Sequence, residues 1–148
     1  MHADTPELFG IRAGQGYGYA GETNTLFLGK RHLLRRAGAD GFSKCAALVL
    51  YSSSGEIALS HVVPGLEGAE KIAFNTYENA IVICGTRTQV GHELMHGLGS
   101  LGFMGVIESL TVPNQTHSFG VFIDADTSRL ATAQRQEPAS IEWYDIHS

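Results

Sequence analysis

Residues 42–64 read FSKCAALVLYSSSGEIALSHVVP, and this stretch decides the fold that the sequence predicts. Apolar and β-branched side chains fill residues 46–51 and again residues 57–63, and a polar Ser/Gly turn separates the two runs. This pattern is typical of a β-hairpin. In a hairpin the start of the first strand lies beside the end of the second. We therefore expect Cys45 and His61 to lie together at one edge of a sheet.

A neighbouring thiol and imidazole suggest nucleophilic chemistry. A cysteine with an ordinary pKa is mostly protonated at neutral pH, so an adjacent base is needed to make it a good nucleophile. His61 on the returning strand is placed to act as that base for Cys45. The alternative is that Cys45 is a small core residue and His61 a hydrogen-bonded strand residue without chemistry.

Length and composition indicate one globular domain, residues 1–148. The chain has 148 residues, of which 43% are hydrophobic and 17% charged. Its formal net charge of −5 argues against a nucleic-acid partner. We expect no membrane partner and no secretory signal, because neither a long apolar run nor a basic-then-apolar leader is present. The two cysteines, Cys45 and Cys84, are expected to stay reduced.

The remainder of the chain reads as further strands with little helix. Further strands are expected at 25–28, 80–84, 103–112, 118–124, 129–133 and 141–144. The best helix candidate is 88–101, residues 69–77 are a weaker one, and residues 38–41 read as a turn. The expected fold is therefore a strand-rich α/β or α+β sandwich with one or two flanking helices.

A resemblance extends the hairpin argument. Ser43-Lys44-Cys45 and the later Ser-His-Val-Val-Pro at 60–64 resemble the active-site hairpin of the CheD-type glutamine deamidases. The same hairpin is similar to that of the catalytic domains of cytotoxic necrotizing factor toxins. The order of strands and helix that follows also resembles a CheD-like chain. The resemblance implies a CheD-like fold and a cysteine deamidase that converts glutamine or asparagine side chains to the acid.

On this resemblance Cys45 is the nucleophile and His61 the general base, with backbone N–H groups of residues 43–45 as an oxyanion hole. Three features depart from the family pattern. Phe42 stands where a glycine is usual, Lys44 lies beside the nucleophile, and the threonine that orients the histidine has no obvious counterpart. Asp40 or a backbone carbonyl are candidates for that third group.

The resemblance also implies a biological setting. No cofactor is expected, and the substrate is expected to be a folded protein. The protein is expected to act in the cytoplasm, or as a toxin or effector that is secreted without a classical signal peptide. The oligomeric state is left open.

A second motif competes for the chemistry. Residues 92–96 read His-Glu-Leu-Met-His, an H-E-x-x-H sequence on the predicted helix. Two histidines four residues apart share a helix face and can bind Zn²⁺ while the glutamate activates water. The motif therefore indicates an alternative function, a small zinc metalloprotease. Such a site needs a third ligand, for example Glu108 or His117.

Two further interpretations stay open. Gly16, Gly18 and Gly21 fit G-x-G-x-x-G, but the residues that follow read as a turn and a strand, so a loop that lines a pocket, or an irregular β connection, is favoured over a dinucleotide site. The chain could also be a non-catalytic interaction module, which a buried Cys45 turned away from His61 would favour.

Overall fold

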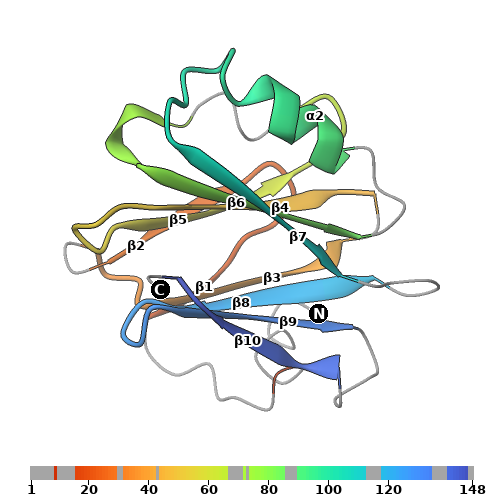
Figure 1. Ribbon diagram of the computed structural model, residues 1–148. Helices are drawn as coiled ribbons and strands as arrows, with labels where there is room; N and C mark the ends of the chain where they lie inside the picture. Colours follow the sequence, from red (N-terminus) through yellow and green to blue (C-terminus); the bar gives the residue numbers. More distant parts are fainter. Residues whose placement is uncertain are drawn as a thin grey trace.

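The structure, a computed structural model, describes most of the chain. The described residues are 9, 16–29, 32–42, 44–66, 72, 74–85, 90–112, 118–134 and 140–146. Within them the chain forms two five-stranded sheets, one α-helix and a short 3-10 helix. The strand-rich sandwich with a flanking helix that the sequence predicts is confirmed (Figure 1).

The two sheets are both mixed. The middle sheet has the order β2 (Thr25–Leu28), β5 (Ile57–Val62), β4 (Ala46–Tyr51), β6 (Asn79–Gly85) and β7 (Val106–Val112). The outer sheet has the order β1 (Tyr17–Tyr19), β3 (Arg36–Phe42), β8 (Phe119–Asp124), β9 (Arg129–Gln134) and β10 (Glu142–Asp145). Helix α2 (Val90–Gly97) lies on the face of the middle sheet that is turned away from the outer sheet (Figure 1).

Alternation along the strands builds the cores on the two faces of the middle sheet. Successive side chains of a strand point to opposite faces. In β4, Ala47 and Val49 pack between the two sheets, whereas Leu48 and Leu50 pack toward α2. Every strand residue from 46 to 50 is buried, so β4 reads as a continuous apolar run rather than an alternating one.

The central hairpin is confirmed. Strand β4 pairs antiparallel with β5, and the register places Ala47 opposite His61 and Tyr51 opposite Ile57. Strand β2 flanks β5, and β6 flanks β4. The hairpin therefore lies inside the sheet, where its register is held from both sides.

The expectation of a turn at residues 38–41 is wrong. Those residues belong to β3, which pairs with β8. The register shifts between Ala39 and Phe42, and Gly41 there adopts a φ of 77°. A glycine with positive φ at an irregularity bends the strand without ending it, so the small residues that suggested a turn form a bulged strand.

Helix α2 is shorter than expected. Its last residue is Gly97 rather than one near 101, and residues 88–89 lie outside the described part. A Cβ on Gly91 would lie 2.5 Å from the sulfur of Cys84, so this glycine lets the helix approach β6 closely. Within the described part of 69–77 the structure has only the 3-10 helix Phe74–Thr76.

Truncation of Leu59 tests the inter-sheet core. Leu59 is fully buried between the sheets, and Leu59→Ala is expected to lower the free energy of unfolding by about 2–5 kcal/mol. The matched control is Leu33→Ala, because the Leu33 side chain is 95% exposed. That control is expected to change stability by no more than about 0.5 kcal/mol. Equal effects in urea denaturation would contradict the described packing.

Candidate functional site

Cys45 lies immediately before β4 at one end of the middle sheet. It is 7% exposed and packs with the cluster between the two sheets, on the same face as Ala47 and Val49. Cys84 lies in β6 opposite Thr111 of β7 and packs on the α2 side of the sheet. The two thiols therefore belong to opposite faces of the sheet.

His61 projects into the same interior from β5. It lies opposite Ala47 in the ladder and is 2% exposed. Its ring packs on Phe42 with 4.3 Å between the centroids, and Phe42 in turn stacks on Phe119 at 5.1 Å. Phe42, the residue that departs from the deamidase pattern, thus forms an apolar wall beside the imidazole.

The loop that precedes β2 is hydrogen-bonded to β5 and forms one side of the site. Thr23 donates a backbone hydrogen bond to the carbonyl of His61 at 2.9 Å, and the N–H of His61 donates to the carbonyl of Asn24 at 3.1 Å. Thr23 has a φ of 65°, so the chain turns sharply there. These two bonds fasten the loop to β5 and place Ala20 and Glu22 beside the histidine.

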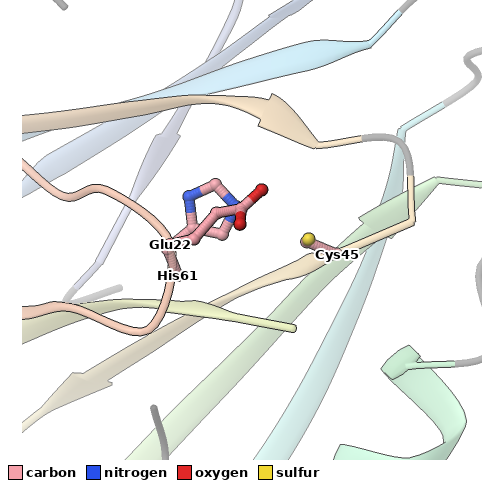
Figure 2. Close-up of side chains that lie close together, drawn as sticks. All are labelled: Glu22, Cys45 and His61. Carbon is pink, nitrogen blue, oxygen red and sulfur yellow. The ribbon is translucent and has the colours of Figure 1, made fainter. Parts of the chain in front are cut away.

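Glu22, Cys45 and His61 form one cluster. One ligand atom from each residue, the cysteine sulfur, a ring nitrogen and a carboxylate oxygen, lies within 4.8 Å of the other two. Figure 2 shows the ring of His61 and the carboxylate of Glu22 together, with the sulfur of Cys45 directed toward them. Glu22 is exposed, whereas the other two are buried, so the carboxylate marks the solvent side of the cluster.

A backbone carbonyl sets the tautomer of His61. Its Nδ1 lies 3.3 Å from the carbonyl oxygen of Ala20. Because a carbonyl can only accept, we assign the proton to Nδ1, which leaves Nε2 as a lone-pair acceptor. Nε2 is buried and makes no hydrogen bond within the described part of the chain. The basic nitrogen is therefore free to accept a proton.

The electrostatics favour a neutral pair. Burial lowers the pKa of His61, and the Ala20 hydrogen bond and the charges of Glu22 and Asp40 only partly oppose this. Burial and then the charge of Glu22 raise the pKa of the Cys45 thiol. Both shifts favour the uncharged forms, a thiol beside a neutral imidazole.

The structure brings Cys45 and His61 together, as the predicted hairpin implies, and buries both of them. Asp40, one candidate for the third group, instead accepts a hydrogen bond from the Tyr19 hydroxyl at 2.6 Å. The other candidate, a backbone carbonyl, is the one that meets the ring, at Ala20. Ser43 lies outside the described residues, so the expected oxyanion hole is described only at residues 44 and 45.

Sequence reasoning missed Glu22. The Gly/Tyr stretch before it, expected to be a loop that lines a pocket or an irregular β connection, contains strand β1, which pairs parallel with β3. The dinucleotide interpretation has no support from the elements that follow, because β1 is followed by the loop and by β2 rather than by a helix. The exposed acidic residue next to Gly21 was the available signal.

The H-E-x-x-H motif lies on α2, as expected. His92 and His96 are exposed, with their rings parallel to within 5° and 5.9 Å apart. Together with Cys84 they line a cavity of about 380 Å³ between α2 and strands β6 and β7. Within the described residues, they belong to no cluster of three ligands.

The third ligand considered for that motif does not reach it. Glu108 pairs with Ile81, whose side chain lies between the sheets, and its charge acts on Tyr51. The cavity beside α2 is instead lined by the next residue, Ser109. Glu108 therefore faces away from the histidines, and His117 lies outside the described part. Catalytic zinc sites use three protein ligands, so the described residues do not complete one here.

Comparison with known proteins adds no relative: no family model matches the chain, and no curated protein matches it significantly. Across the described ranges, no helix is both long and apolar enough to traverse a bilayer.

The lowered pKa of His61 predicts a pH-dependent stability. The unfolded state has an ordinary histidine pKa of about 6.5 and binds the proton first as pH falls. The free energy of unfolding is therefore expected to fall as pH drops through that value. In His61→Asn, which retains a donor for Ala20, this part of the decline disappears. Urea denaturation across this range measures the difference, and parallel curves for the two proteins would contradict the buried neutral imidazole.

Removal of the Glu22 charge tests the cluster itself. Because that charge raises the pKa of Cys45, Glu22→Gln is expected to lower the pKa and to speed iodoacetamide alkylation of Cys45 at neutral pH. A Cys84→Ser background leaves one thiol to titrate by ultraviolet absorbance. The exposed Glu93→Gln serves as the charge-matched control and is expected to change neither quantity. An unchanged pKa of Cys45 in Glu22→Gln would mean that the carboxylate and the thiol do not interact, and would contradict the described cluster.

Proposed function

We propose that this protein is a cysteine-dependent deamidase that converts glutamine or asparagine side chains of a protein to the acid. The observation that carries the proposal is that His61, whose buried Nε2 has no partner among the described residues, lies in one cluster with the Cys45 thiol. A backbone carbonyl holds the opposite nitrogen. This is the arrangement of a nucleophile, its base and the group that orients the base.

The reaction proceeds through a thioester. Nε2 accepts the thiol proton while the sulfur of Cys45 forms a bond to the carboxamide carbon. The carbon–nitrogen bond then breaks, and His61 returns the proton to the departing ammonia. Water, deprotonated by the same Nε2, attacks the thioester and releases the carboxylate and the thiol. One water is consumed, one ammonia leaves, and the enzyme is regenerated.

Glu22 and Ala20 support the charged intermediate. His61 becomes an imidazolium when it takes the proton, and its burial opposes that charge. The Glu22 carboxylate and the Ala20 carbonyl both favour the protonated ring. Their contribution is largest in the transition state, where the charge develops, and it is smaller in the neutral resting pair.

The substrate class follows from the resemblance and from the position of the pair. Cys45 and His61 lie at an end of the middle sheet, with exposed Lys44 and Glu22 at its rim. A carboxamide presented by a folded protein fits such a site better than a free amino acid. We propose a role as a toxin or effector, acting in the cytoplasm or after export without a classical signal peptide, on the basis of the resemblance.

Loss of either member of the pair is expected to abolish deamidation or to slow it strongly. Cell extracts incubated with the purified protein are expected to release ammonia and to acquire glutamate or aspartate at specific amide positions in peptide mass spectrometry. Cys45→Ala removes the nucleophile and eliminates both signals. His61→Asn lowers the rate by at least about 100-fold.

Cys84→Ala is the matched control, because that thiol lies on the opposite face of the sheet, and it is expected to retain activity. Conversion that persists in Cys45→Ala, or that requires His92 and His96, would contradict the proposal.

A further inference from the structure

The cluster that serves the proposed reaction also has the composition of a metal site. It offers a thiol sulfur, an imidazole nitrogen and a carboxylate oxygen within 4.8 Å of one another. These are the three ligand types that Zn²⁺ takes in proteins. Within the described residues this is the one group of at least three histidine, cysteine or acidic side chains that lie so close.

The histidine supplies an independent reason to place a ligand there. His61 is 2% exposed, and its Nε2 makes no hydrogen bond in the described part of the molecule. Its Nδ1 already faces the Ala20 carbonyl, an outer partner of the kind that orients metal-bound imidazoles. The ring is thus held with Nε2 buried and unpartnered in the described part, while one of its nitrogens lies in the cluster.

We infer that Cys45 Sγ, His61 Nε2 and the Glu22 carboxylate bind Zn²⁺, and that the bound ion masks the Cys45 nucleophile. Zinc lies about 2.3 Å from sulfur and about 2.0 Å from nitrogen, so tetrahedral ligands are about 3.5 Å apart. Separations of up to 4.8 Å between the ligand atoms would shorten toward that spacing on binding. The exposed Glu22 side chain can move to meet the ion. Water takes the fourth position on the solvent side.

Binding exchanges a proton for the metal. The S–H bond of Cys45 breaks, a sulfur–zinc bond forms, and the proton passes to solvent. His61 releases no proton, because its proton lies on Nδ1 toward the Ala20 carbonyl and Nε2 has a free lone pair among the described residues. A thiolate ligand favours zinc over magnesium or calcium, which take oxygen ligands. The masking of the proposed enzyme rests on the proposed function, whereas binding itself does not.

Cobalt reports the site without any assay of activity. Co²⁺ substitutes for zinc, and thiolate ligation gives a charge-transfer band in the near ultraviolet. Titration of the reduced full chain with Co²⁺ is expected to produce this band, and Zn²⁺ is expected to remove it. The band is expected to be absent in Cys45→Ser and to require at least about tenfold more metal in Glu22→Gln.

Two controls separate this cluster from the other candidate ligands. Cys84→Ser and the double variant His92→Asn/His96→Asn are expected to keep the full band, since those residues line the cavity beside α2. A band that survives Cys45→Ser, or that is lost in either control, overturns the inference. Glu22 is exposed, so Glu22→Gln remains informative if Cys45→Ser fails to fold.

Alkylation tests the masking independently of catalysis. Zn²⁺ is expected to protect Cys45, but not Cys84, from iodoacetamide, and a chelator is expected to restore the reaction. Unprotected Cys45 at saturating zinc overturns the inference. If protection is found but no Cys45-dependent deamidation occurs, the metal site stands and the proposed function fails. If deamidation occurs and zinc does not inhibit it, the inference fails alone.

Discussion

The antiparallel register of β4 with β5 is the constraint on which the site depends. It places His61 opposite Ala47, and both side chains face the space between the sheets. A slip of one residue would turn His61 to the α2 face and separate it from Cys45. Strands β2 and β6 pair with the outer sides of the hairpin and hold that register. The geometry of the pair is thus a property of the whole middle sheet.

Burial has two opposite effects in this site. It makes the imidazole a neutral acceptor at neutral pH, and it raises the pKa of the thiol that must become a nucleophile. A buried acceptor left without a partner costs about 1–3 kcal/mol. A histidine that serves only packing gains nothing in return for that cost. A base that takes a proton during reaction, or a ligand that receives a metal ion, uses the same free lone pair.

The hairpin could be predicted from the sequence because the signals that define it are local. Two apolar runs and a Ser/Gly turn define both strands and bring Cys45 near His61. The turn expected at 38–41 failed because small residues also suit a bulged strand. Glu22 was missed because its position depends on long-range backbone bonds from Thr23 and Asn24 to His61. The Ala20 carbonyl carries no side-chain signal at all, so a backbone group could be named only as one candidate.

The protonation state of His61 tests the central claim most directly. The ¹⁵N chemical shifts of its two ring nitrogens, measured by NMR in uniformly labelled protein, distinguish the two tautomers from the imidazolium. The account predicts a protonated Nδ1 and an unprotonated Nε2 at neutral pH, with the Nε2 signal altered in Cys45→Ala. A proton on Nε2, or an imidazolium at neutral pH, would contradict the assignment of His61 as the base for Cys45.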